Sequence, residues 1–185
     1  MGVNGAPNKE GSCAKLLKRA LKAAEKSGAR TKIIHLIDEQ RVFFHSHLSR
    51  KPEKDFIEMR NMLLESDGFI LTSPVYWMNV SALMKNFIDK LTVLEEQGFL
   101  LEGKVAGFIV TENEGGGWEA IKSMAMPLNH MGVLSPPYSM IFHNFNLRKQ
   151  KISRWMDNDI ELLGKNIVTM CKMIRETKPN WDYDK

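Results

Sequence analysis

Cysteine and long hydrophobic runs are scarce in this sequence, and each shortage excludes a class of protein. Only Cys13 and Cys171 occur among the 185 residues, in no CxxC pair or metal-type cluster, which argues against a disulfide scaffold and for a reducing compartment. No apolar stretch reaches the ~20 residues of a membrane span, and residues 1–11 lack the apolar region of a signal peptide. We therefore expect a cytoplasmic protein that does not enter a membrane.

Charge of one sign is not in large excess either. The net charge is +4 and the pI is near 9.0, but the basic residues are dispersed and most have acidic neighbours. This pattern is typical of a solvated surface, so no nucleic-acid partner is expected. The apolar fraction of 43% is ordinary for a globular domain and predicts a core that needs no disulfide.

Strand-like and helix-like segments alternate along the chain without a repeat or a linker. Strands are predicted at residues 3–5, 31–37, 68–73, 104–111 and 133–142. Helices are predicted from an N-cap at Ser12 to a stop at Gly28, and at 53–65, 80–91, 118–131 (with a kink at Pro127) and 152–174. The predicted fold class is α/β, a doubly wound sheet of five parallel strands in one domain, residues 1–185, whose first strand is short or truncated at the N-terminus.

Ligands of doubly wound sheets bind at the carboxyl ends of the strands, so three loops are expected to share one site. The first loop, Gly5–Cys13, leads into a helix N-terminus, where free N–H groups bind anions; Ser12 adds a hydroxyl and Gly11 permits close approach. Its spacing matches neither a P-loop nor G-x-G-x-x-G, and it suits a phosphate monoester. A plain turn followed by an N-cap is the alternative interpretation.

The second and third loops indicate a flat ligand. Apolar residues Val75–Met78 follow a buried strand, where a ring system such as a flavin would cover them. Packing of Tyr76 and Trp77 in the core or at a subunit interface is the alternative. The three glycines Gly115–Gly117 follow the next buried strand and allow a ligand to approach the backbone, or else form a flexible turn.

Taken together, the three loops resemble those of the NADPH-dependent FMN reductase family, in the flavodoxin-like superfamily. The matching stretches are NGAPNKEGSCAKLL, SDGFILTSPVYWMNVSALMKNFIDKL, TENEGGGWEAI and NHMGVLSPPY. The second stretch is close to the family pattern S-P-V-Y-W-x-N-x-S-A-x-x-K-x-F-I-D-R, and the resemblance spans most of the chain. It implies a flavodoxin-like three-layer sandwich with strand order 2-1-3-4-5 that binds FMN non-covalently.

The resemblance also implies a set of cofactor contacts. Around the phosphate it places Pro7, Lys9, Gly11, Ser12 and Cys13. Along one side of the isoalloxazine ring it places Pro74, Val75, Tyr76, Trp77, Met78 and Asn79, and at the other edge Thr111, Glu112, Gly115, Gly116 and Gly117. Two departures stand out, because Ala6 replaces a usual serine and Ser12-Cys13 an Asn-Thr pair, so one hydroxyl ligand of the phosphate is missing.

The implied activity is that of an FMN-dependent NAD(P)H oxidoreductase, in which hydride passes from NAD(P)H to the flavin and electrons pass on to a quinone, a nitro or azo compound, a metal ion or free flavin. The flavin carries this chemistry, so no catalytic side chain is expected. Relatives imply a homodimer or higher homo-oligomer. The alternatives are a flavodoxin-type electron carrier, which the basic charge disfavours, and a flavin-free structural or regulatory relative, which the Ala6 and Cys13 departures would suit.

Three other features suggest chemistry that we do not expect. His45 and His47 form an H-x-H pair, but no third zinc ligand is evident. Some relatives carry a cysteine-rich iron–sulfur insert after the second strand, whereas the corresponding stretch here, 41–52, has no cysteine. Cys13 stands at a helix N-terminus, where a lowered thiol pKa would allow a redox role, but a bound phosphate would occupy that place.

Overall fold

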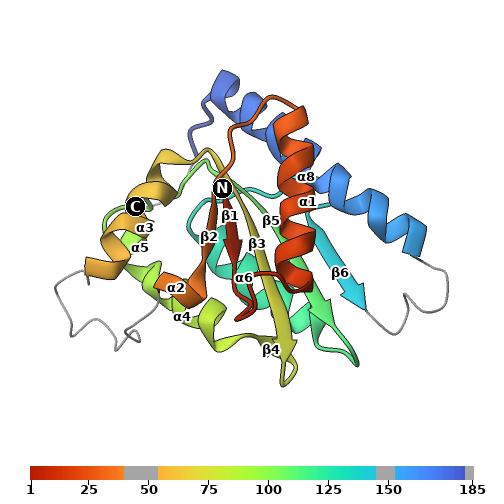
Figure 1. Ribbon diagram of the computed structural model, residues 1–185. Coiled ribbons are helices and arrows are strands. Elements are labelled where there is room, and N and C mark those ends of the chain that lie inside the picture. The colour runs from red at the N-terminus through yellow and green to blue at the C-terminus, as the bar shows by residue number, and fades with distance from the viewer. Residues whose placement is uncertain (40–53, 145–152, 182–185) are drawn as a thin grey trace.

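The computed structural model describes residues 1–39, 54–144 and 153–181. In this part of the chain, five parallel strands form a sheet in the order β2-β1-β3-β5-β6 (Figure 1). A short sixth strand, β4, pairs antiparallel with β3 off that path. The strands are β1 (Gly2–Asn4), β2 (Ile33–His35), β3 (Gly68–Tyr76), β4 (Asn79–Val80), β5 (Val105–Glu112) and β6 (Met140–Asn144).

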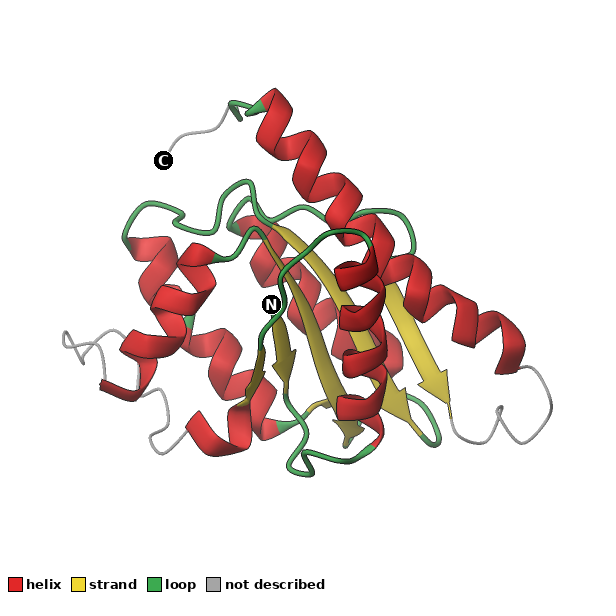
Figure 2. Ribbon diagram, turned by 45° about the horizontal axis from the view of Figure 1, so that its top comes forward, coloured by secondary structure: helices red, strands yellow, loops and turns green. Residues whose placement is uncertain are grey.

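Helices cover both faces of the sheet (Figure 2). One face carries α1 (Ser12–Lys26) and α8 (Ser153–Thr177), and the other side carries α3 (Lys54–Glu65), α4 (Ala82–Lys90), α5 (Thr92–Glu96) and α6 (Gly117–His130), with α2 (Leu36–Glu39) following β2. The flavodoxin-like α/β fold is thereby confirmed. The five parallel strands follow the predicted order 2-1-3-4-5, and β4 is one strand more than predicted.

Two separate apolar clusters hold the layers together because successive strand side chains point to opposite faces. In β5, Ile109 packs with α1 and α8, whereas Phe108 and Val110 pack with the helices of the other side. In β3, Ile70 and Leu71 divide in the same way. Continuous apolar runs of this kind are typical of parallel strands buried on both faces.

Several predicted boundaries differ from the structure. Residues 31–37 form a strand only from Ile33 to His35, because the chain turns into α2 at Leu36. The last strand begins at Met140, and within 133–139 the ladder is limited to a single bridge from Leu134 to Val105. The N-cap of α1 is Gly11, and Ser12 is the first helical residue.

The strand β3 extends through Pro74 to Tyr76, although its end was predicted at Ser73. Proline lacks the N–H that a ladder needs. Here β1 ends opposite Thr72, so the missing N–H of Pro74 costs no bond to β1. The vacated edge is then taken by β4, which pairs with β3 at Val75 and Tyr76.

None of the helices in the described part of the chain is both long enough and apolar enough to traverse a lipid bilayer. The helix α8 was predicted to bury six apolar side chains. Ile160, Leu163 and Ile167 are buried and Ile174 is half-buried, as predicted. Ile152 and the side chain of Met156 lie outside the described residues.

Candidate functional site at the carboxyl ends of the strands

The three predicted loops lie together at the edge of the sheet where β1, β3 and β5 end (Figure 1). Buried Cys13 Sγ, from the start of α1, lies 3.1 Å from Thr111 Oγ1 at the end of β5. The third loop meets the second at Gly116, where an added Cβ would stand 2.5 Å from Met78 Cα. The first loop is joined to the segment just after the second by Ser81, the N-cap of α4, whose hydroxyl donates to the Gly5 carbonyl at 2.6 Å.

The first loop presents the N-terminus of α1. Asn8 shapes the turn, since its side-chain Oδ1 accepts from Glu10 N–H at 2.9 Å and its carbonyl accepts from Gly11 N–H at 3.2 Å. Gly11 gives the helix no side-chain cap, and the first turn holds no acidic residue. The earliest N–H groups of a helix lack intrahelical partners and carry the positive end of its dipole, so this turn can receive an anion.

Cys13 is not an activated thiol. Its side chain is 2% exposed, and burial raises the pKa of the thiol to about 11, against which the bond to Thr111 acts only weakly. The lowered pKa that a helix N-terminus suggested is therefore wrong, because the loss of hydration on burial outweighs the hydrogen bonds that would lower the pKa. Cys13 and Thr111 turn their side chains toward each other, so any contact of Cys13 with a phosphate would come from its backbone N–H.

The second loop is the tip of a β-hairpin. Trp77 and Met78 connect β3 to β4 and have φ angles of 47° and 61°. Positive φ at both central positions belongs to a type I′ turn, which Asn-Gly normally occupies, and side chains there carry strain of about 1 kcal/mol or more each. Trp77 is 99% exposed, and Tyr76 and Met78 are about half exposed. The hairpin thus holds a large aromatic surface in water next to the helix N-terminus.

The third loop is fixed by the side chain of Glu112. Its Oε2 accepts the N–H of Gly117, the first residue of α6, at 2.8 Å, and its Oε1 accepts from Asn144 Nδ2 at 3.2 Å. Gly116 has φ 89°, a conformation that glycine adopts without strain. The ring of exposed Trp118, the second residue of α6, packs on Phe142 of β6 with centroids 4.3 Å apart.

A buried polar network supports the loops, and the sequence pattern did not reveal it. Ser73 Oγ accepts from Ser81 N–H at 2.9 Å, and Ser81 Oγ accepts from Met84 N–H at 3.1 Å, which caps α4. Asn4, fully buried at the end of β1, binds Ala6 and neighbouring strands. A polar residue as the last position of a buried strand, directly before the loop, is the signal that would have pointed to Asn4.

The predicted cofactor residues therefore divide into three groups by what their side chains do. Those that face open space or present backbone are Pro7, Gly11, Ser12, Tyr76, Trp77, Met78 and Gly115. Those that the fold already uses are Cys13, Asn79, Thr111, Glu112, Gly116 and Gly117. Lys9 pairs with Asp38 at 2.8 Å and is half exposed, while Pro74 and Val75 belong to β3.

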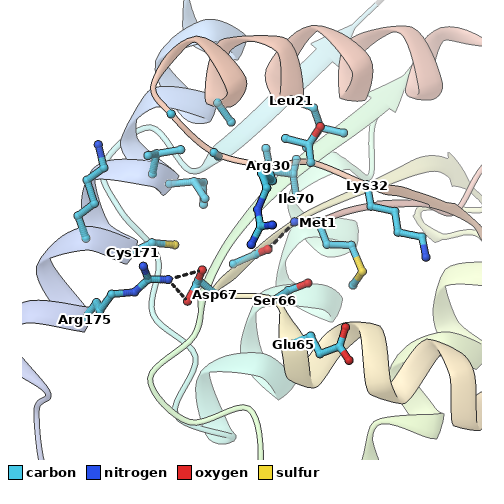
Figure 3. A pocket seen from close by; sticks show the side chains of 18 of the residues that line it. Met1, Leu21, Arg30, Lys32, Glu65, Ser66, Asp67, Ile70, Cys171 and Arg175 are labelled. Atoms are coloured by element: carbon cyan, nitrogen blue, oxygen red, sulfur yellow. Dashed lines mark hydrogen bonds and ion pairs between the residues drawn. The ribbon is translucent and has the colours of Figure 1, made fainter.

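A separate cavity of about 640 Å³ lies at the opposite end of the sheet, beside Met1 (Figure 3). Two of its cations have structural partners: Arg175 pairs with Asp67 at 2.8 Å, and Lys172 donates to the Ser27 carbonyl at the end of α1. Helix C-termini attract such cations. Lys172 thus contacts the C-terminal end of α1, and Arg175 contacts a carboxylate between α3 and β3.

No group of three or more metal-binding side chains occurs in the part of the chain that the structure describes. His45 and His47 lie outside the described residues, as does the stretch 41–52. The described loop residues present backbone N–H groups and exposed aromatic rings, while the carboxylates of Glu10 and Glu112 are already bonded to Lys18 and to Gly117 and Asn144. Such a set suits a planar organic anion, and an FMN phosphate at the start of α1 with its ring along the hairpin fits these residues.

Comparison with known proteins shows the family of this chain. The sequence model of the family described as NADPH-dependent FMN reductase matches residues 1–146. An iron-sulfur flavoprotein of Archaeoglobus fulgidus is 35% identical over 117 residues, which cover 60% of this chain and 52% of that protein. The chain thus spans about half the length of this curated relative.

Solved structures show the same fold at low sequence identity. The protein RosB, solved with 8-demethyl-8-formylriboflavin-5′-phosphate, superposes with a TM-score of 0.79 at 18% identity, covering 95% of this chain and 79% of that one. An oxidoreductase of Corynebacterium diphtheriae gives a TM-score of 0.74 at 16% identity, with 93% and 96% covered.

Proposed function

This chain belongs to the NADPH-dependent FMN reductase family, and from that premise we propose that it binds FMN and acts as a flavin-dependent oxidoreductase. One observation carries the proposal. Three strand-end loops meet where an uncapped helix N-terminus stands beside an exposed aromatic hairpin. An anion site next to a flat apolar surface matches the two chemical halves of a flavin mononucleotide.

The phosphate would be held by the first turn of α1. The N–H groups of Ser12 and Cys13 and the Ser12 hydroxyl are its donors, and the absence of an acidic residue in that turn leaves the helix dipole uncompensated. Ala6 brings no hydroxyl, so backbone groups carry more of the binding. Lys9, held by Asp38, would add positive potential rather than a direct contact.

The ring would lie against the hairpin and the glycine loop. Trp77 and Tyr76 offer aromatic faces, and their removal from water on binding would contribute favourably. An added Cβ at Gly115 would meet no atom within 4 Å, so the backbone of this loop has open space beside it. Its N–H groups would orient the polar edge of the ring.

FMN supplies the hydride and electron chemistry when it is bound. The residues of this chain bind it, orient it and exclude water from one face of the ring. We propose NAD(P)H as the hydride donor, and a quinone, a nitro or azo compound, a metal ion or free flavin as the acceptor. We also propose a cytoplasmic homodimer or higher homo-oligomer, which light scattering of the purified chain would test.

We do not propose an iron–sulfur cluster for this chain, although a relative is named an iron-sulfur flavoprotein. Clusters of the [2Fe–2S] and [4Fe–4S] types take four thiolate ligands. The two cysteines of this chain are too few, and burial raises the pKa of each thiol to about 11.

Calorimetric titration of the purified apoprotein with FMN and with riboflavin tests the proposal. We expect FMN to bind at least about tenfold more tightly, because riboflavin lacks the phosphate that the helix N-terminus receives. Trp77→Ala should weaken the binding of FMN and of riboflavin by the same factor. Tyr138→Ala is the matched control, since this exposed aromatic precedes β6 at the amino end of the strand. An apoprotein that binds neither ligand would refute the proposed function.

Stopped-flow mixing of the flavin-loaded protein with NADPH separates an enzyme from a flavodoxin-type carrier. Direct bleaching of the flavin absorbance is expected. A carrier would stay oxidised until a partner protein supplied electrons.

A further inference from the structure

Asn4, the last residue of β1, connects the first loop to both neighbouring strands. It is fully buried and stands opposite His35 of β2 and Thr72 of β3. Its Oδ1 accepts from Ala6 N–H at 3.2 Å and from the Thr72 hydroxyl at 3.3 Å. Its Nδ2 lies 2.9 Å from His35 Nδ1 and 3.5 Å from the Ala6 carbonyl oxygen. One amide therefore holds the first residue of the loop after Gly5.

The chemistry of these partners permits only one arrangement. The backbone N–H of Ala6 can only donate, so the atom of Asn4 that faces it must be Oδ1. The Nδ2 group then faces His35, and because an amide nitrogen only donates, His35 Nδ1 must accept. The imidazole must therefore be neutral, with its proton on Nε2.

We propose that Asn4 is a positioning residue for the loop that receives the flavin phosphate, and that neutral His35 fixes the orientation of its amide. A protonated imidazole would place an N–H against Asn4 Nδ2, so two donors would face each other. Either the ring would swing away, or the amide would turn its NH₂ toward Ala6 N–H and release the loop. The relevance to flavin rests on the proposed function, whereas the coupling of His35 to the loop does not.

The charges around His35 support a neutral ring near pH 7. Burial lowers its pKa; Asp38 on α2 raises it, Lys9 and Lys18 lower it, and Glu10 raises it. These four groups pair with one another, Lys9 with Asp38 at 2.8 Å and Lys18 with Glu10 at 3.0 Å. On β1 the facing side chain is the uncharged Asn4. Protonation of His35 is therefore expected below its ordinary range, at mildly acidic pH.

The coupling can be tested in the apoprotein without any flavin. Long-range ¹⁵N–¹H correlation spectra of the imidazoles should show His35 as the Nε2–H tautomer at pH 7.5. Hydrogen exchange at the Ala6 amide should accelerate about tenfold, beyond the intrinsic pH trend, as His35 protonates. A Nδ1–H tautomer at pH 7.5, or Ala6 exchange that ignores the titration of His35, would overturn the inference.

Flavin affinity supplies the second test. His35→Asn places an amide oxygen where Nδ1 stood and removes the titration, so it should keep the affinity of the wild type at pH 7.5. Because the phosphate of FMN itself titrates near pH 6, the pH profile of this variant gives the contribution of the ligand. Between pH 7.5 and pH 5, the FMN affinity of the wild type should fall about fivefold more than that of His35→Asn.

Variants at other positions complete the comparison. Asn4→Ala should lose about tenfold in FMN affinity at every pH and should show fast Ala6 exchange. His130→Asn, at an exposed histidine on α6, is the control and should behave as the wild type. Identical pH profiles for the wild type and His35→Asn would contradict the proposal even if Asn4→Ala did not fold. An Nε2–H tautomer with pH-dependent Ala6 exchange, but no FMN binding, would support the loop coupling and refute the proposed function.

Discussion

Some side chains at the carboxyl ends of the strands form hydrogen bonds within the protein and are therefore not free to contact a ligand. The family resemblance implied that Glu112 contacts the edge of the flavin. In the structure its two carboxylate oxygens accept from Gly117 N–H and Asn144 Nδ2. The pattern of residue types placed Glu112 at the right edge of the sheet, but it could not reveal these partners, because Asn144 lies on another strand.

Substitution of Glu112 should therefore lower the stability of the fold. Glu112→Ala leaves the first N–H of α6 without its acceptor and should lower the free energy of unfolding by about 1–2 kcal/mol. Glu112→Gln keeps an oxygen for Gly117, and the amide of Asn144 can rotate to accept from its NH₂ group, so this variant should cost less than half as much. Urea unfolding followed by circular dichroism measures both. Equal losses in the two variants would show that charge, and not the acceptor, is what matters.

The buried thiol of Cys13 makes stability depend on alkaline pH. Its pKa is raised to about 11 in the folded state, so between the ordinary thiol range and pH 11 the unfolded chain loses a proton that the folded chain keeps. Unfolding is then favoured as pH rises, and the folded state should lose roughly 2 kcal/mol across that window. Cys13→Ser has no titration there, so unfolding curves of the two proteins should diverge between pH 8.5 and 11. Parallel curves would show that the thiol is not buried as described.

At the scale of elements, strands buried on both faces were predictable and the hairpin was not. The apolar runs beginning at Gly68 and Lys104 located β3 and β5, since a continuous apolar run of that length is typical of a central parallel strand. The turn at Trp77 and Met78 gave no such signal. A type I′ turn is recognised by Asn-Gly or Asp-Gly, and here two bulky residues adopt it.

The third loop depends on glycine at position 116 for two reasons, which substitutions can separate. Gly116 has φ 89°, and its added Cβ would stand 2.5 Å from Met78 Cα. Gly98 has φ 97°, but its added Cβ would meet nothing within 4 Å. Gly98→Ala should therefore cost about 1 kcal/mol from the backbone alone. Gly116→Ala should cost at least twice as much in thermal unfolding, and an equal loss would mean that the two loops do not touch.

At the scale of the whole molecule, the order of the five parallel strands followed from the alternation of the chain and the family resemblance. The structure agrees because each crossover helix must cover one face of the sheet. The contact of α1 with α8 had no sequence signal beyond an apolar stripe, since the two helices lie at opposite ends of the chain. Their close approach rests on Gly164, where an added Cβ would overlap the carbonyl oxygen of Ala20.

Gly164→Ala should have two opposite effects on stability, one from helix propensity and one from packing. Alanine in the interior of a helix is favoured over glycine by about 1 kcal/mol. The overlap with Ala20 must push the helices apart, and overpacking of this kind costs about 1–3 kcal/mol or more. We expect a net loss of stability, seen as a lower midpoint of thermal unfolding. A higher midpoint would mean that α1 and α8 are farther apart than described.

The helix α1 thus has two roles, one at its first turn and one at its middle. Its first turn faces the loop edge, and its middle is clamped by α8, a segment that the matched family region of residues 1–146 does not include. By thermodynamic linkage, a ligand that stabilises the first turn of α1 also raises the free energy needed to detach α8 from α1. Protease cleavage within α8 should then become slower when flavin is added. The cleavage rate would report whether the site at the carboxyl ends of the strands is occupied.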